Sequence, residues 1–268
     1  MLRVKLSVVY ALVLMTAALG LTACSSTPVD KTATMSPNAI YADAKDAVDA
    51  GQYDKAIPLY EKLEARAAGT PLAQQAQLDK AYAQYRTQEP AQAISTLDRF
   101  MKLHPASPAL DYALYLKGTI NFNDDLGMFS AISRQDLSER DQKASKEAFE
   151  SFKELVTRFP DSRYAPDARQ RMNYIVGSLA QYEVHVARYY YKRGAYLAAI
   201  NRAQTAVADY RNVPASEEAL FIIYKSYDAL GMGSLRDDAK RVLENNYPGS
   251  EFLTKGARST NDPWWKLW

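Results

Sequence analysis

The chain has 268 residues, of which 47% are hydrophobic and 24% are charged, and its formal net charge is only +2. This balance leaves no basic excess for binding nucleic acid, so no nucleic-acid partner is expected. The single cysteine, Cys24, excludes an internal disulfide, and the two histidines, His104 and His185, are too far apart in the sequence to suggest a metal site.

Residues 1–23 have the layout of a bacterial secretory leader. Arg3 and Lys5 form a short basic start, and the uncharged apolar run LSVVYALVLMTAALGL leads to small residues before Cys24. The run is too short for a convincing transmembrane span, which needs about 20 apolar residues. The sequence therefore predicts that the leader is removed, which lowers the formal net charge from +2 to zero.

The stretch LTAC, which ends at Cys24, resembles the lipobox of bacterial lipoproteins. The resemblance implies cleavage before Cys24 and covalent lipid on its sulfur and its new amine, and no other cofactor is expected. A plain leader with a chance cysteine is the alternative. Two or more acyl chains make a membrane anchor stable. Residues 24–37, rich in Ser, Thr and Pro, are expected to form a flexible tether behind this anchor.

Ser25 follows the lipidated position and bears on the location of the protein. Lipoproteins that stay in the inner membrane of many Gram-negative bacteria typically carry Asp at this place. The resemblance therefore implies an anchor in the inner leaflet of the outer membrane, with the folded part facing the periplasm.

Four similar segments punctuate the rest of the chain. KLHPAS, TRFPDS, RNVPAS and NNYPGS each end a predicted helix, because proline cannot continue a helix interior. The serine two places after each proline is expected to cap the next helix. Pro214 and Pro248 are 34 residues apart, which is the tetratricopeptide period. Gly51 and Gly194 are expected to supply turns between paired helices, and an alanine five residues after each glycine lets the helices cross closely.

The sequence predicts an all-α fold of five tetratricopeptide helix pairs, stacked in a right-handed superhelix with a concave face. Helices are expected at residues 37–50, 54–68, 72–87, 91–103, 108–124, 142–159, 163–193, 195–211, 215–230 and 234–246. The third pair is irregular, because a long insertion separates Gly118 from Ala148. Its loop at residues 126–141 either folds back over the groove or a helix end, or acts as a gate or docking element.

These boundaries divide the folded part and leave a tail. Residues 38–125 hold pairs one and two and the first helix of pair three, and residues 142–250 hold the remainder of the helix pairs. Residues 251–268 form a tail that carries all three tryptophans in DPWWKLW. These rings either pack on the last pair or contact a membrane interface or a partner.

An aromatic peptide groove is predicted on the concave face of residues 38–125. If Ala44, Ala81 and Gly118 mark the helix crossings, residues three before, one after and four after each of them face the groove. The candidate groove residues are Tyr41, Tyr82, Tyr85, Tyr115 and Phe122, with Lys45, Val48, Leu78 and Thr119 beside them. Such rings and hydroxyls suit an extended peptide that ends in an aromatic residue, but tyrosines at helical spacing also pack between neighbouring pairs.

Catalytic chemistry has little support in the sequence. The chain contains neither an H-E-x-x-H nor a G-x-S-x-G motif, and its carboxylates are scattered over amphipathic helix faces. An enzyme is therefore not expected.

Several ordered motifs resemble the BamD (ComL) family, the lipoprotein subunits of the outer-membrane β-barrel assembly machinery. The resemblance covers about Asn38 to Pro248 and follows the lipobox. It rests on NAIYADAK, STLDRFMKLHPASPALDYALYLKG, the insertion that ends in SERD, FPDSRYAPDA and ARYYYKRGAYLAAINR.

The resemblance implies a scaffold that docks on the periplasmic domains of the central barrel subunit, BamA, and on accessory lipoproteins. Residues 142–250 are the expected docking region, and the Arg of the NR pair, here Arg202, is implied to pair with an acidic group of BamA. The resemblance also implies a role in recognising the C-terminal β-signal of unfolded outer-membrane proteins. The alternative is a tetratricopeptide adaptor associated with peptidoglycan or cell division, although the irregular third pair argues against it.

Overall fold

The computed structural model of the chain describes residues 31–123 and 142–255. Each of the ten predicted helices has a counterpart there, and no boundary differs from the predicted one by more than two residues. The main helices are α2(Pro37–Asp49), α3(Tyr53–Arg66), α4(Pro71–Arg86), α5(Pro90–Leu103), α6(Leu110–Asn123), α8(Gln142–Arg158), α9(Ala165–Lys192), α10(Tyr196–Asp209), α11(Ala215–Ala229) and α12(Gly233–Asn246). The described residues contain no strand, so the all-α prediction is confirmed.

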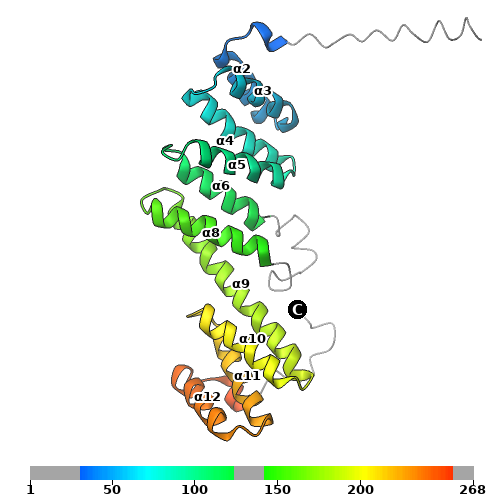
Figure 1. Ribbon diagram of the computed structural model, residues 1–268, viewed down its shortest axis with the longest axis vertical. Helices are drawn as coiled ribbons and strands as arrows, with labels where there is room; N and C mark the ends of the chain where they lie inside the picture. The colour runs from blue at the N-terminus through cyan, green and yellow to red at the C-terminus, as the bar shows by residue number, and fades with distance from the viewer. Residues whose placement is uncertain (1–30, 124–141, 256–268) are drawn as a thin grey trace, which may run out of the picture.

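The helices form one elongated stack in chain order, with α2 and α3 at one end and α12 at the other (Figure 1). Each helix packs mainly against the next one in the chain, and α9, which has 28 residues, also packs along α11. This alternation of first helices (α2, α4, α6, α9, α11) and second helices (α3, α5, α8, α10, α12) is that of tetratricopeptide pairs. The hand of the superhelix and the division into five repeats stay predictions.

Small residues lie where paired helices cross, as the sequence predicts. Ala44 and Ala81 on first helices are fully buried. The matching alanines of four second helices are fully buried as well, namely Ala56, Ala93, Ala148 and Ala199. At Gly118 the approach is closest, since a Cβ placed on this residue would lie 2.5 Å from Cε1 of Phe152 on α8. The second helix of a pair can therefore lie directly against the backbone of the first.

The turns within pairs use the left-handed backbone region that glycine adopts at little cost. Gly51 and Gly194 have φ angles of 72° and 74°, which confirms their predicted role. In the second pair Gln88 occupies the equivalent place with φ of 62°. Helix starts are fixed by Ser36 and Thr70, whose side chains accept hydrogen bonds from backbone N–H groups of α2 and α4.

Two local predictions are wrong. The serines after the prolines do not cap helices, because Ser107 and Ser162 instead accept from the N–H two residues ahead, before α6 and α9 begin, and Ser216 lies inside α11. The predicted tether is too long, because residues 31–34 form a 3-10 helix (η1, Lys31–Thr34) in which Thr32 is buried and accepts a hydrogen bond from Arg66 of α3.

The predicted tail also begins with structure. Residues Glu251–Lys255 form a short helix, α13, that packs against α11. Phe252 stacks on Phe221 of α11 with ring centres 5.5 Å apart. The folded part therefore continues to Lys255, five residues beyond the predicted boundary at residue 250.

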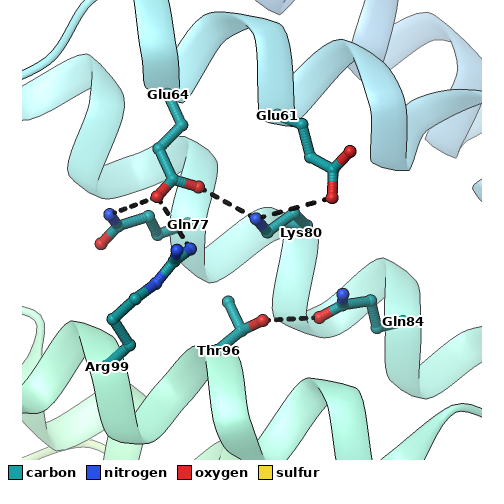
Figure 2. Close-up of polar contacts among 7 residues, drawn as sticks. All are labelled: Glu61, Glu64, Gln77, Lys80, Gln84, Thr96 and Arg99. Carbon is teal, nitrogen blue, oxygen red and sulfur yellow. Dashed lines mark hydrogen bonds and ion pairs between the residues drawn. The ribbon is translucent and has the colours of Figure 1, made fainter.

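A partly buried charge network joins the first two helix pairs (Figure 2). Glu64 of α3 accepts hydrogen bonds from Lys80 and Gln77 of α4, both at 2.9 Å, and pairs with Arg99 of α5 at 2.8 Å. The Lys80 side chain is only 7% exposed, and a second carboxylate, that of Glu61, lies 3.9 Å from its Nζ. Burial raises the pKa of Glu64, but the hydrogen bonds from Lys80 and Gln77 and the charge of Arg99 outweigh it, so the net pKa is lowered.

Replacing Gly118 by Ala is expected to destabilise the fold by about 1–3 kcal/mol, because the added methyl group overlaps the buried ring of Phe152. Gly177→Ala on α9 is the matched control, because a Cβ placed there meets no neighbouring atom within 4 Å and alanine favours the helix by about 1 kcal/mol. Urea unfolding followed by circular dichroism measures both changes. Equal effects of the two substitutions would contradict the close crossing of α6 and α8.

Glu64→Gln is expected to cost about 3 kcal/mol of unfolding free energy, because the buried ammonium of Lys80 loses its closest carboxylate. Lys80→Met should cost less, since Glu64 keeps Arg99 and Gln77. The lowered pKa of Glu64 means that its contribution is present at neutral pH and is lost as the pH falls through its folded-state pKa. Glu244→Gln, which removes an exposed pair with Lys240, serves as the control. A larger loss for Lys80→Met than for Glu64→Gln would refute this account of the network.

Candidate functional site

Some predicted sites lie outside the described residues. They are the lipid attachment site Cys24, the inserted loop at residues 126–141 and the tryptophans of the tail. The predicted groove and Arg202 lie within the described ranges, so their surroundings can be compared with the predictions.

The first helices are joined to one another by hydroxyl–carboxylate bonds on the face where the groove is predicted. Tyr41 of α2 donates to Asp79 of α4 at 2.9 Å, and Tyr115 of α6 donates to Asp167 of α9 at 2.8 Å. Burial, followed by the nearby charge of Asp79, raises the pKa of Tyr41 to about 12, so this hydroxyl keeps its proton at neutral pH. Two of the predicted groove tyrosines therefore tie neighbouring first helices together.

A cavity of about 440 Å³ lies between α4, α6 and the turn before α9. Asp79 and Gln75 line it from α4, and Asp111 and Tyr112 line it from α6. Arg163 and Tyr164 complete the lining. The cavity opens between first helices, which is where the sequence predicts a concave binding face, and its lining is mixed in charge.

Beside this cavity, α6 and α9 meet along a stripe of aromatic and charged side chains. Tyr115 stacks on Tyr164 with ring centres 4.7 Å apart. Further along the two helices, Phe122 meets Tyr174 edge to face at 5.8 Å, and the guanidinium carbon of Arg171 lies 5.0 Å from the centre of the Phe122 ring. We call the four residues Phe122, Asp167, Arg171 and Tyr174 the α6–α9 patch.

Two other predicted groove residues, Tyr82 and Tyr85, pack against neighbouring helices. Tyr82 packs edge to face on Tyr53 of α3 and accepts a hydrogen bond from Arg86 at 2.8 Å. Tyr85 is partly buried against the core between α4 and α5. The expectation that Leu78 faces the groove is wrong, because its side chain is 1% exposed and packs in the same core. Leu78 is nevertheless one of the residues that line the 440 Å³ cavity.

Arg202, the predicted partner-binding residue, lies on α10 and is 46% exposed. Its Nη1 donates to Oε2 of Glu183 on α9 at 3.2 Å, and the Glu183 side chain is only 7% exposed. The sequence did not reveal this internal partner. Because the pair holds the guanidinium at the surface of α10, the remaining N–H groups of Arg202 can face an external acid.

A second and larger cavity, of about 780 Å³, lies between α5 and α8 over Leu114 of α6. Its lining includes both acidic and basic residues, for example Glu147, Lys153 and Arg158. The lining of this larger cavity therefore does not favour a ligand of either charge. The face between the first helices, in contrast, combines aromatic rings with charged groups that are held in place by hydrogen bonds. The latter is the better candidate for a binding site.

The sequence reasoning missed Asp79, Tyr164, Asp167, Arg171 and Tyr174. It assigns a crossing residue only to α2, α4 and α6, so the fourth first helix, α9, contributes nothing to the predicted groove. The signal was present, because 164, 167, 171 and 174 follow one another at spacings of three and four residues, which places them on one face of a helix.

Burial raises the pKa of Asp167, but hydrogen bonds from Arg171 and Tyr115 outweigh it, and the net pKa is lowered. The α6–α9 patch therefore carries an ionised carboxylate that holds Arg171 in place. Within residues 31–123 and 142–255, no group of three or more His, Cys, Asp or Glu residues is arranged to hold a metal ion. None of the helices in these ranges is both long and apolar enough to cross a membrane.

Comparisons with known proteins show which family the chain resembles. A family model described as "Outer membrane lipoprotein" (YfiO) matches residues 33–243. The outer membrane protein assembly factor BamD of Neisseria meningitidis serogroup B (strain ATCC BAA-335 / MC58) is 46% identical, covering 96% of this chain and 98% of the relative. BamD of Vibrio cholerae serotype O1 is 33% identical, covering 83% of this chain and 92% of the relative. Among solved structures, the crystal structure of MamA protein is similar over 83% of this chain and 96% of that chain, at 17% identity and a TM-score of 0.38. Because the family model spans most of the chain and the two relatives align over nearly their whole length, the chain belongs to the BamD family of outer membrane lipoproteins.

Proposed function

We propose that this chain is a lipid-anchored scaffold of outer-membrane protein assembly, which binds the central barrel subunit and helps to recognise unfolded barrel proteins. The observation that carries the proposal is the 46% identity over 96% of the chain to a relative named as an outer membrane protein assembly factor. The relatives are assembly factors rather than enzymes. This favours the assembly role over an adaptor for peptidoglycan or cell division.

The C-terminal helix pairs supply the docking side of this function. Arg202 is oriented by the buried carboxylate of Glu183 and still exposes nearly half of its surface. An acidic group on a periplasmic domain of BamA can pair with such a guanidinium without first having to order it. Accessory lipoproteins are further partners in this proposal, and the described residues do not distinguish their docking surfaces.

The face between first helices supplies the substrate side. The cavity between α4 and α6 and the adjoining aromatic stripe offer apolar area, hydroxyls and both charges to an extended chain. The C-terminal β-signal of an unfolded outer-membrane protein has the aromatic end that such a surface fits. The expected location is the inner leaflet of the outer membrane, with lipid on Cys24 and the helices in the periplasm.

Cys24→Ala is expected to abolish lipidation and to release most of the protein from the membrane fraction, because the acyl chains supply the anchor. Ser25→Ala keeps the thiol and is the matched control. In cells of the native host depleted of the wild-type protein, folded outer-membrane barrel proteins should fall, and they should recover less with Cys24→Ala than with Ser25→Ala. Mass spectrometry of the mature N-terminus and immunoblots of membrane fractions measure these results. An unmodified Cys24, or barrel protein levels that do not change on depletion, would contradict the proposal.

Arg202→Ala is expected to weaken binding to the periplasmic domains of the central barrel subunit at least about tenfold, since a charge-assisted pair is lost. The same change leaves Glu183 without its guanidinium and should lower stability by about 1–3 kcal/mol. The double variant Arg202→Ala, Glu183→Gln removes this buried charge, so it should regain stability but not binding. Glu183→Gln alone keeps Arg202 and should bind nearly as well as the wild type. Biolayer interferometry measures binding to the central barrel subunit, and thermal unfolding measures stability. A stable double variant that binds normally would exclude Arg202 from the interface.

A further inference from the structure

The last long helix, α12, lies at one end of the stack (Figure 1). Each of the other second helices, α3, α5, α8 and α10, packs against the first helix that follows it in the chain. After α12 the described residues contain only α13, which has five residues and packs mainly against α11. Within the described part of the chain, α12 therefore lacks the following helix that covers every other second helix.

Large hydrophobic side chains are exposed on α12. Leu235 is 46% exposed, Val242 is 41% exposed, and Met232 at the N-cap is 42% exposed. Together with the buried Ala239, they follow one another at spacings of three, four and three residues, which places them on one side of the helix. We call Met232, Leu235, Ala239 and Val242 the α12 stripe.

The equivalent places on other second helices carry no large hydrophobic residue. Leu235 and Val242 stand three and ten residues after the N-cap of α12. On α3, α5 and α10 these two places are polar or small, namely Lys55 and Lys62, Gln92 and Arg99, and Ala198 and Thr205. The terminal repeat of a helical stack needs a polar outer face for solubility. The α12 stripe departs from this rule, which indicates that another segment covers it.

The sequence after α13 supplies a segment of matching chemistry. Residues 256–268 carry all three tryptophans of the chain, Trp264, Trp265 and Trp268, and Leu267 lies between the last two. Tryptophan buries a large apolar area when it packs, and clustered exposed indoles favour association. The tail needs an apolar surface, and the α12 stripe is an apolar surface without a cover among the described residues.

The tail begins close enough to the stripe to reach it. Phe252 and Leu253 of α13 pack against a cluster that includes Leu243, the neighbour of Val242 on α12. Trp264 follows Lys255 by nine residues, which span about 30 Å at most, and α12 is about 21 Å long. A segment tethered at such short range has an effective concentration on the order of millimolar, so even weak apolar contacts suffice to hold it.

We infer that residues 256–268 dock on the α12 stripe of the same chain, with tryptophan rings against Leu235 and Val242, and cap the C-terminal end of the helix stack. This contact removes both the indoles and the exposed side of α12 from water. It is independent of the proposed assembly role, because it needs no partner and no substrate.

Tryptophan emission tests the inference, because every tryptophan of the chain lies in this tail. The mature chain from residue 24 is made with Cys24→Ala, so that it carries no lipid and needs no detergent. When only tryptophan is excited, the emission should lie at a shorter wavelength than that of an isolated peptide of residues 256–268. Acrylamide should also quench the chain several-fold less than the peptide. Equal emission and equal quenching of chain and peptide would overturn the inference.

Leu235→Gln combined with Val242→Gln should raise the quenching to the level of the peptide, because the rings lose their apolar contacts. Gln92 occupies the equivalent place on α5 and glutamine favours helices, so α12 should stay folded, which circular dichroism checks. Leu197→Gln is the matched control, since it changes a 61% exposed leucine of α10 and should leave the emission as it was. If Leu197→Gln exposes the tryptophans and the α12 variant does not, the tail docks elsewhere and the inference fails.

Two further measurements identify the occupant of the stripe. Benzoylphenylalanine in place of Leu235 should crosslink to residues 256–268 within one chain, as mass spectrometry of the monomer band would show. A crosslink formed only between two chains would assign the stripe to a second copy and refute the contact within one chain. Vesicles of phosphatidylethanolamine and phosphatidylglycerol should leave the emission unchanged. Tryptophans that are protected only when vesicles are present would show a membrane contact instead.

Discussion

Close crossing of paired helices at alanine and glycine is the constraint on which the rest of the structure depends. Where Gly118 meets the Phe152 ring, there is no room for a methyl group, and fully buried alanines occupy matching places along the stack. Such contacts fix how each second helix lies on its first helix. They therefore also fix which side of every first helix is left for its neighbours and for ligands.

The exposed sides of the first helices are then joined by polar contacts. The hydroxyl groups of Tyr41 and Tyr115 donate hydrogen bonds to Asp79 and Asp167. Arg188 of α9 forms a bidentate ion pair with Glu218 of α11. A hydroxyl that donates to a carboxylate on the next helix fixes the spacing of the two helices, and the rings of Tyr41 and Tyr115 stay partly exposed. The same side chains can thus hold the stack together and present a surface, so packing and binding are not exclusive roles for these tyrosines.

Helix positions could be predicted from the sequence because proline, glycine and alanine act locally, through backbone angles and short contact distances. The crossings at Ala44, Ala81 and Gly118 and the turns at Gly51 and Gly194 follow from such local rules. The partners of individual side chains could not be predicted in this way, because they depend on which helices become neighbours in space. Glu183, which comes 19 residues before Arg202, is one such case, and Asp167, 52 residues after Tyr115, is another.

Arg202 and Arg171 illustrate how a helical scaffold can fix the orientation of a partly exposed guanidinium. Each guanidinium is held by a carboxylate of its own chain, Glu183 in one case and Asp167 in the other. A free arginine side chain loses rotamer freedom when it binds, at a cost of about 2 kcal/mol. Part of that cost has already been met during folding where an internal carboxylate fixes the side chain. An internal ion pair of this kind leaves guanidinium N–H groups for a second acceptor, because the planar guanidinium carries five donors.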